Sequence, residues 1–183
     1  YVLDEWQKFC IRGILSEDRS ANLCALVCLL LVPRQNGKNI VLEIIELYGL
    51  FVLDLRYILH SAHLTETSAD HMGRVWEAIQ SDDDLASRAK ISTAHGFEKI
   101  ERTDARCRIR FRTRGKKVGR GGSPQMVVFD EALFLTDAHM SALLPSMSAQ
   151  TLAPDQPILI YASSAPVWES EVLHRTRQAL LAG

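Results

Sequence analysis

The chain has 183 residues, of which 47% are hydrophobic and 23% charged, a size and composition typical of one soluble domain with a sizeable core. Its longest apolar run, residues 25–32, is far shorter than the roughly 20 residues that span a bilayer, so we expect no contact with a membrane. The four cysteines form no CxxC pair and the six histidines have no matching ligand spacing, which argues against a zinc site and favours reduced thiols.

Apolar residues recur with two alternating periods, and this alternation predicts strands separated by helices. The expected order is a helix at 6–14, a strand within 23–32, a helix at 39–51, a strand at 55–61, a helix at 66–80, strands at 106–113 and 126–129, a helix at 137–147, a strand at 157–162 and a helix at 169–182. This pattern predicts an α/β fold whose central sheet is mostly parallel and carries helices on both faces.

Two of these elements have a predicted buried face. The nearly unbroken apolar run before Pro33 is typical of a buried parallel strand. In the helix that follows, one stripe carries the apolar side chains Ile40, Ile44, Leu47 and Phe51.

His60 and His63 form an HxxH pair at the end of a predicted strand, where ordinary packing is favoured over a metal site.

A candidate phosphate-binding loop lies between that strand and that helix. Such loops need backbone N–H groups and a helix N-terminus aimed at phosphate, together with a Lys that neutralises the outer phosphates. Val32 stands where the first Gly of the pattern G-x-x-x-x-G-K-[ST] would be, and Asn39 stands where Ser or Thr would be. A surface turn with a solvated Lys is the alternative. The expected nucleotide contacts are Pro33, Arg34, Gln35, Asn36, Gly37, Lys38 and Asn39.

The second half of the candidate site is an apolar strand that ends in two carboxylates, Asp130 and Glu131. In such sites the Asp holds Mg²⁺ and the Glu activates the attacking water. The alternative is that both residues only cap the next helix. Beside Lys38, the pair predicts a P-loop NTPase of the RecA or ASCE type, with ATP as substrate and Mg²⁺ as cofactor.

These segments, taken in order, resemble the large terminase subunits of tailed phages over nearly the whole chain. The resemblance rests on DEWQ at 4–7, PRQNGKN at 33–39, LHSAH at 59–63, FRTRGKKVGRGGSPQMVVFDEA at 111–132 and ILIYASSAP at 158–166. The loop is similar to the family's variant that has an early Arg and lacks the first Gly. Asn39 departs from the usual Ser or Thr, which implies an atypical metal dependence.

The resemblance implies a role for each matching residue. Lys38 would bind the β and γ phosphates, Asn39 and Asp130 would hold Mg²⁺, and Glu131 would be the general base. Arg34 would act on the γ phosphate in cis, and Arg120 would act in trans from a neighbouring subunit. By the same resemblance, Gln7 would recognise adenine, and Ser163 with Ser164 would sense the γ phosphate. Otherwise Gln7 is an ordinary exposed helix residue, and the two serines only end a strand before Pro166.

The resemblance also implies a biological setting. The chain is expected to be the single ATPase domain, residues 1–183, of a motor that packs double-stranded viral DNA into a procapsid. Its partners would be DNA, the portal, the small terminase subunit and further copies in a ring, in the cytoplasm of the infected bacterium. A full-length subunit would add a C-terminal RNase H-like nuclease domain, and no further carboxylate cluster follows the last predicted strand, so these residues are expected not to cut DNA.

Charge is concentrated in one segment, since the net charge is −1 whereas residues 106–120 hold eight basic side chains and no acidic one. Period-2 spacing predicts that alternate arginines share one face of a strand. That face would follow a DNA backbone without reading sequence, contact another subunit, or be a charged exposed edge strand. The candidate contact residues are Arg106, Arg108, Arg110, Arg112, Arg114, Lys116 and Lys117.

Two rival functions remain open on these residues. The segment Asp130-Glu131-Ala132 also resembles the DEAD-type box of superfamily 2 helicases, which need a second RecA-like lobe. The replacements at Val32 and Asn39 also fit a DNA-binding or docking module that hydrolyses nothing. Strand-separation assays would identify the helicase, and DNA affinity indifferent to ATP and to Glu131→Gln would identify the docking module.

Overall fold

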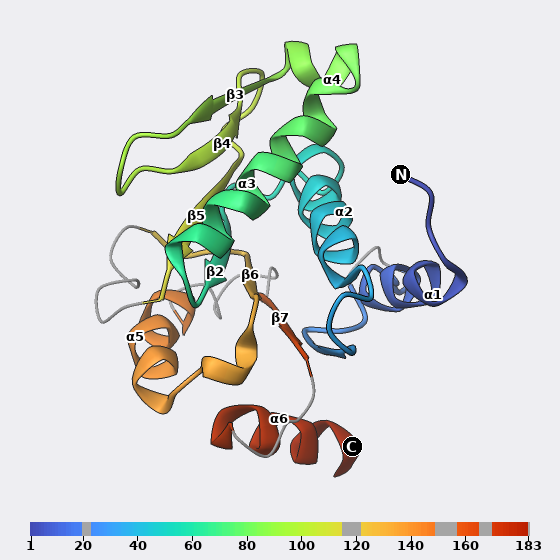
Figure 1. Cartoon of the computed structure of the whole chain (residues 1–183), viewed down its shortest axis with the longest axis vertical. Helices are drawn as coiled ribbons and strands as arrows, with labels where there is room; N and C mark the ends of the chain where they lie inside the picture. Colours follow the sequence, from blue (N-terminus) through green and yellow to red (C-terminus); the bar gives the residue numbers. More distant parts are fainter. Residues whose placement is uncertain (20–22, 115–121, 149–156, 165–169, 183) are drawn as a thin grey trace.

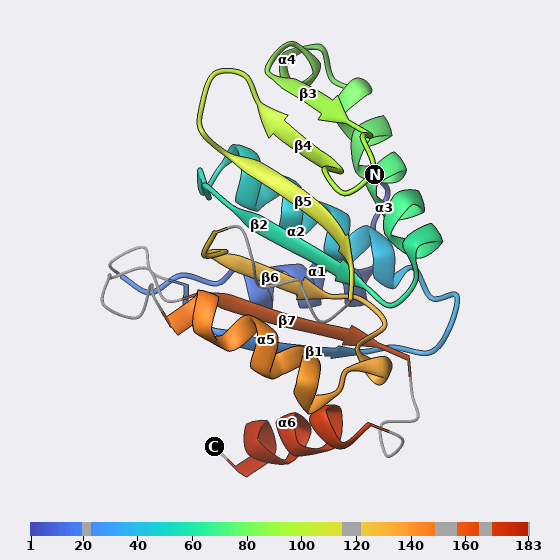
Figure 2. The same ribbon diagram turned by 90° about the vertical axis from the view of Figure 1, so that its left-hand side faces the viewer.

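A computed structural model describes residues 1–183 except 20–22, 115–121, 149–156, 165–169 and 183. Its centre is a seven-stranded sheet in the order β1-β7-β6-β2-β5-β4-β3, with helices against both faces (Figures 1 and 2). The strands are β1 (Val27–Leu31), β2 (Ile58–Ala62), β3 (Ala89–Ser92), β4 (Lys99–Arg102), β5 (Arg108–Thr113), β6 (Met126–Phe129) and β7 (Ile158–Ser163). The predicted α/β fold with a mostly parallel sheet is confirmed.

Helices connect the parallel strands, as such crossovers require. They are α1 (Glu5–Ile14), α2 (Lys38–Phe51), α3 (Thr65–Gln80), α4 (Asp83–Ser87), α5 (Asp137–Ser148) and α6 (Glu171–Ala182), with a short 3₁₀ helix η1 (Ala132–Phe134). The pairings from β1 to β5 across the sheet are parallel, so these strands end at one shared edge, here called the carboxyl edge. The opposite edge, where they begin, is called the amino edge.

Alternating strand residues build a core on each face of the sheet. On one face, Ile58, Ile109 and Val128 pack with apolar side chains of α1, α2 and α3. On the other, Leu59 and Val127 pack with apolar side chains of α5 and α6. Because both faces are covered there, β6 is buried throughout, whereas strands at the ends of the sheet are more exposed.

The strand expected within residues 23–32 is parallel but is not buried. β1 lies at the edge of the sheet beside β7, and Leu30 is its one buried residue. The face of α2 was also predicted wrongly. Its fully buried side chains include Val41, Leu42 and Ile45, because α2 packs against the sheet, α1 and α3 at once and not along one stripe.

The region between α3 and β5 differs most from expectation. Sequence periodicity indicated no element there, yet the region contains α4, and β3 and β4 extend the sheet with antiparallel pairings. β3 and β4 are four residues each, and β4 contains only one apolar residue, so the two segments are too short and polar to give a periodic signal. Their presence makes β5 an interior strand between β2 and β4, so the prediction of an exposed edge strand is wrong. Among the described residues, no helix has the length and apolarity to cross a bilayer.

Candidate nucleotide site

The loop between β1 and α2 has the backbone expected of a phosphate cradle. Gln35 and Gly37 both have positive φ, 62° and 74°, and Gly37 caps the N-terminus of α2. A Cβ atom on Gly37 would lie 2.6 Å from Gln7 Nε2, so the position requires Gly for space as well as for conformation. The loop thus turns sharply into a helix N-terminus, the arrangement that favours anions.

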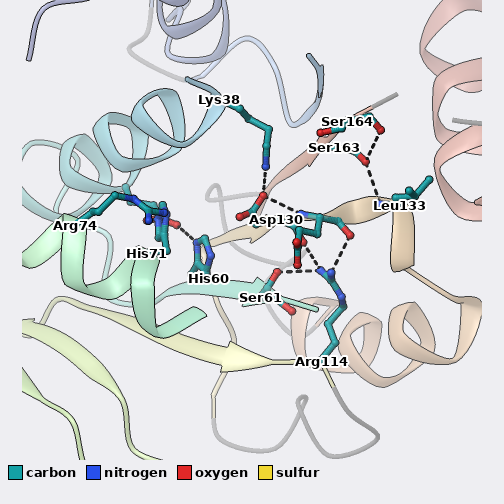
Figure 3. A network of polar contacts seen from close by, with 12 residues as sticks. Lys38, His60, Ser61, His71, Arg74, Arg114, Asp130, Leu133, Ser163 and Ser164 are labelled. Carbon is teal, nitrogen blue, oxygen red and sulfur yellow. Dashed lines mark hydrogen bonds and ion pairs between the residues drawn. The ribbon is translucent and has the colours of Figure 1, made fainter. Parts of the chain in front are cut away.

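Lys38 and Asp130 are brought together across the carboxyl edge. The ammonium of Lys38 contacts the Oδ1 atom of Asp130, although 92 residues separate them (Figure 3). Asp130 also accepts a hydrogen bond from the backbone N–H of Glu131 at 2.8 Å. Burial alone would raise the pKa of Asp130, but Lys38, His60 and the backbone N–H of Glu131 together outweigh burial and lower the pKa. Both side chains are largely buried, with exposed fractions of 14% for Lys38 and 2% for Asp130.

Glu131 adopts a conformation unusual for a residue with a side chain. Its φ and ψ are 50° and 45°, in the left-handed region, immediately after β6. Its Oε2 atom is buried and has no hydrogen-bond partner among the described residues. A buried carboxylate oxygen without a partner is costly. Because no donor in the described part of the chain occupies this oxygen, its lone pairs remain unused, as those of a general base must be.

Arg114, which directly follows β5, holds this turn from the far side of β2. Its guanidinium donates to the backbone oxygens of Ser61 at 3.0 Å, Asp130 at 2.7 Å and Glu131 at 2.9 Å (Figure 3). Burial lowers the pKa of the guanidinium to about 10, against the opposing effect of Glu131 and Asp130. We expected Arg114 on the basic face of a strand, but β5 ends at Thr113 and Arg114 belongs to the site. The signal missed was its place directly after a parallel strand.

Ser163 lies at the end of β7, between β1 and β6 in the sheet. Its hydroxyl accepts from the N–H of Leu133 at 3.2 Å and donates to the oxygen of Ser164 at 3.2 Å. The serine therefore joins the end of β7 to the segment after Glu131. Ser164 is half-buried beside it.

Gln7 is buried, so its interpretation as an exposed helix residue is wrong. Its Oε1 accepts from the N–H of Asp4 at 2.9 Å in a capping box, and its Nε2 donates to the oxygen of Gly37 at 3.2 Å. Both ends of the amide are thus engaged, and Gln7 holds the loop from α1.

The other predicted contact residues lie around the loop or outside the described residues. Arg34, Gln35 and Asn36 are exposed in the loop, as is Pro33. Asn39 is half-buried in the first turn of α2. Arg120, Lys116 and Lys117 fall among residues that the structure does not describe.

The donors near Lys38 fit Mg²⁺ in kind. The Asp130 carboxylate and the Asn39 amide both offer oxygen, the ligand atom that this ion prefers. Soft ligands are absent from this set, because the cysteines in the described structure lie on other elements. Asp130 and Asn39 thus offer oxygen ligands of the kind that Mg²⁺ takes.

A second buried cluster lies behind Asp130, between α2, β2 and α3. Glu46 receives His60 Nδ1 at 2.7 Å and His71 Nε2 at 2.7 Å, and all three side chains are fully buried. The carboxylate accepts both contacts, and Arg74 Nη2 lies 3.4 Å from the other nitrogen of His71. Figure 3 shows His60 between His71 and Asp130. Sequence reasoning missed this cluster because its members come from three separate elements.

The geometry of this cluster fits a bridging carboxylate better than a metal ion. The rings of His60 and His71 are stacked, 4.0 Å apart and 14° from parallel, so their N–H bonds run side by side toward the two oxygens of Glu46. Ligand atoms of one zinc ion lie about 3.3 Å apart, given bonds of about 2.0 Å. The facing nitrogen of each imidazole here lies 2.7 Å from a Glu46 oxygen, which is a hydrogen-bond distance. Burial would raise the pKa of Glu46, but the imidazoles outweigh it and hold the pKa at about 2. Burial lowers the pKa of His60.

His63, the other member of the HxxH pair, does not join this cluster. Its ring stacks on Phe134 with centroids 4.3 Å apart. The preference for packing over a shared metal site at His60 and His63 agrees with this arrangement.

Comparisons with known proteins give a consistent picture of the fold. No protein-family model and no curated protein sequence matches the chain. The large terminase of bacteriophage HK97 superposes with a TM-score of 0.75 at 20% identity, over 89% of this chain and 33% of that one. The large terminase ATPase domain of Thermus phage P74-26 gives 0.62 at 17% identity, over 92% and 68%.

A large terminase from a thermophilic bacteriophage, solved in complex with ADP, gives a TM-score of 0.60 at 9% identity, over 88% of this chain and 39% of that one. The complex of the same terminase with ATP-gamma-S gives 0.59 at 11% identity, over 88% and 38%. The chain thus spans about a third of the HK97 terminase and less than half of the terminase solved with ADP. The fold of this chain is that of the ATPase domains of phage large terminases.

Proposed function

We propose that this chain hydrolyses ATP with Mg²⁺, as the ATPase part of a terminase large subunit that moves double-stranded viral DNA into a procapsid. The observation that carries the proposal is the meeting of Lys38 and Asp130 at the carboxyl edge, below a loop that opens a helix. That edge is where parallel α/β sheets bind ligands. The likeness in fold to terminases solved with ADP and ATP-gamma-S supports it.

The residues divide the chemistry between them. The backbone of residues 34–37 and the Lys38 ammonium bind and orient the outer phosphates. Glu131 orients a water molecule on Oε2 and takes its proton as the water oxygen attacks the γ phosphorus and ADP leaves. Arg114 holds the backbone of Asp130 and Glu131, so the two carboxylates keep their places while charge moves.

Asn39 and Asp130 hold Mg²⁺ in this proposal. The bound ion neutralises charge that develops on the phosphates. Arg34, exposed at the start of the loop, reaches the γ phosphate in cis, and Arg120 supplies a second guanidinium to a neighbouring copy.

Ser163 transmits the loss of the γ phosphate from the nucleotide site to β7. Its hydroxyl already links β7 to the segment after Glu131, so a shift of Glu131 alters the contact with Leu133. Gln7 connects the phosphate loop to α1 through its hydrogen bond to the oxygen of Gly37. It therefore positions Gly37, whether or not adenine also contacts it.

The working motor in this proposal is a ring of copies, with the portal and the small terminase subunit as partners, acting in the cytoplasm of the infected bacterium. Double-stranded DNA is the cargo. Phosphate contacts from basic side chains grip it without reading its sequence, as translocation requires.

The test is steady-state hydrolysis of Mg-ATP over a series of protein concentrations. Turnover per chain is expected to rise with concentration if Arg120 acts in trans. Lys38→Ala is expected to abolish nucleotide binding, and Glu131→Gln is expected to lower turnover by about 10²-fold to 10⁴-fold while binding persists. The matched control is Glu66→Gln, because Glu66 is exposed on α3.

Each alternative function predicts a different result in assays of nucleotide binding, hydrolysis, DNA affinity or strand separation. Nucleotide binding without turnover at any concentration, with DNA affinity indifferent to ATP and to Glu131→Gln, would replace the motor with a docking module. Separation of duplex strands would point to a helicase lobe. Absence of nucleotide binding altogether would refute the nucleotide site.

A further inference from the structure

A basic pocket lies at the amino edge, at the opposite ends of the strands from Lys38 and Asp130. It has a volume of about 630 Å³ and is lined by Arg56, Tyr57, Arg106, Arg108, Gly122 and Ser123. These residues immediately precede or begin β2, β5 and β6. Of the residues that the structure describes, none with an acidic side chain lines the pocket. Five strand residues span about 16 Å, so the pocket is separate from the nucleotide site.

The arginines of this pocket differ from the structural arginines nearby. Arg88 and Arg102 each form ion pairs with two aspartates. Among the described residues, no carboxylate pairs with the guanidinium of Arg56, Arg106 or Arg108. Their like charges are therefore held together without compensation from the described part of the chain, which is unfavourable unless an anion joins them.

Arg108 is held in place before any ligand arrives. Its guanidinium lies over the ring of Tyr57, 5.0 Å from the centroid, and its Nε atom is buried without a hydrogen-bond partner among the described residues. Stacking fixes the plane of the guanidinium, so little side-chain entropy remains to be lost on binding. Tyr57 is itself 7% exposed and anchored in the core under α5 and α6.

Gly122 forms the opposite wall. A Cβ atom there would lie 3.5 Å from the Tyr57 ring and 3.8 Å from Arg108 Nη2, and the residue has a φ of 126°. The backbone thus passes close to Arg108 at a position that favours Gly. A larger residue would narrow the pocket next to its best-fixed guanidinium.

We propose that this pocket binds a backbone phosphate of double-stranded DNA, through Arg56, Arg106 and Arg108. The proposal rests on the function proposed above, and it names where that function grips its cargo. Guanidinium groups suit phosphodiester oxygens because they donate paired hydrogen bonds. Arg56 and Arg106 are exposed, so a polymer can reach the pocket without entering the fold. Contacts of this kind position a duplex and do not read its sequence.

This assignment divides the basic segment that the sequence presented as one surface. Arg106 and Arg108 belong to the pocket, whereas Arg114 is committed to backbone oxygens at the carboxyl edge. Arg56 joins from the turn before β2, some fifty residues earlier in the chain. The pocket therefore exists only in the folded sheet.

The test measures the affinity of the protein for a short blunt-ended duplex of random sequence over a range of salt concentrations. Arg56→Gln, Arg106→Gln and Arg108→Gln are each expected to weaken binding by about tenfold. Each is also expected to lower the magnitude of the salt slope by about 0.9, the value for one phosphate contact. Arg177→Gln removes the same charge from the exposed face of α6 and is the control, expected to change neither.

A second measurement locates the contact directly. Duplex DNA is expected to protect Arg56 and Arg106 from an arginine-specific reagent such as phenylglyoxal, with modified peptides identified by mass spectrometry. Inorganic phosphate at the same ionic strength is expected to protect them much less. Equal protection by phosphate would overturn the assignment to DNA in favour of a site for free phosphate.

The outcomes separate this proposal from the motor itself. If the three variants behave like Arg177→Gln while wild-type protein binds duplex and hydrolyses ATP, the pocket is refuted and the motor stands. If the variants lose DNA affinity while wild-type protein never hydrolyses ATP, the pocket stands and the motor fails. If wild-type protein binds no duplex at any salt concentration, the pocket is refuted as a DNA site.

Discussion

The two edges of the sheet treat charge in opposite ways. At the carboxyl edge, Lys38, Asp130 and Arg114 are largely buried and are paired with each other or with backbone oxygens. At the amino edge, the arginines of the basic pocket share one sign and have no carboxylate partner among the described residues. Both edges belong to the same strands, so the difference comes from the residues that flank them.

This difference is the one expected if the proposed nucleotide site lies at the carboxyl edge and the proposed DNA contact at the amino edge. A catalytic site needs both signs, fixed in a medium of low polarity, because preorganised dipoles and charges stabilise a transition state. A surface that binds a polyanion needs positive side chains that are not paired with acidic residues of the protein. Binding then releases counterions and breaks no ion pair within the protein. Substitutions that remove a charge should therefore have opposite consequences at the two edges.

The sharpest comparison is between Arg114→Ala and Arg106→Ala. Arg114→Ala leaves the oxygens of Ser61, Asp130 and Glu131 without their donor, so the free energy of unfolding is expected to fall by about 3 kcal/mol and ATP turnover to drop with it. Arg106→Ala, at an exposed position, is expected to change that free energy by less than about 0.5 kcal/mol. Urea denaturation of both variants provides the measurement. Equal losses would contradict the distinction between the edges.

The next largest effect concerns the cluster behind Asp130. Glu46→Gln keeps the shape of the side chain but removes the charge that holds His60 and His71, so it is expected to reduce the free energy of unfolding by about 2 kcal/mol. The control is Glu77→Gln, which changes an exposed carboxylate on α3 and is expected to be nearly neutral. Thermal or urea unfolding of the two variants tests this. A neutral Glu46→Gln would mean that the carboxylate is not the hub of the cluster.

Acid should weaken the same cluster. Burial lowers the pKa of His60 below its usual 6.5, so the unfolded chain takes up a proton that the folded chain resists. Stability is therefore expected to fall as the pH drops below 6.5, by up to about 1.4 kcal/mol per pH unit from this residue. An NMR titration of the imidazoles is the direct measurement, with exposed His95 as internal control. A measured pKa of His60 above 6.5 would contradict the expectation.

The smallest effect has the opposite sign. Arg56→Gln removes one of several like charges around the basic pocket, so thermal stability is expected to rise slightly, by a few tenths of a kcal/mol at low salt, while DNA affinity falls. The rise should disappear at high salt, because screening already relieves the repulsion. Thermal melts at low and high ionic strength test this, and a loss of stability at low salt would show that Arg56 has a structural partner.

Much of the site could be predicted because its residues occupy places that short sequence patterns define. Lys38 and Gly37 come at the junction of a strand and a helix, and Asp130 and Glu131 end an apolar strand. Parallel strands gather such ends at one edge, so their proximity follows from the pattern. The contact between Lys38 and Asp130 confirms that part.

Other features could not be predicted from local patterns. Arg114 appeared to continue the period-2 series of β5, but the pairing of β5 with β2 ends at Thr113, and the Arg114 side chain lies in the site. On the sequence, Gln7 was either an adenine contact implied by the resemblance or an exposed helix residue, and its burial depends on where α1 packs. The strands β3 and β4 are too short and polar to produce a periodic signal.

The sequence by itself determined the α/β alternation, the position of the phosphate loop and the paired carboxylates, because each depends on periodicity or on spacing within a few residues. Only the tertiary structure decided which arginines pair with protein oxygens and which line the basic pocket. It also decided which histidines contact Glu46. Those outcomes depend on which distant segments the fold brings together: Arg56 and Arg108 line one pocket, and Glu46 accepts a hydrogen bond from His71. Pairing and burial are properties of such contacts, and no local pattern carries them.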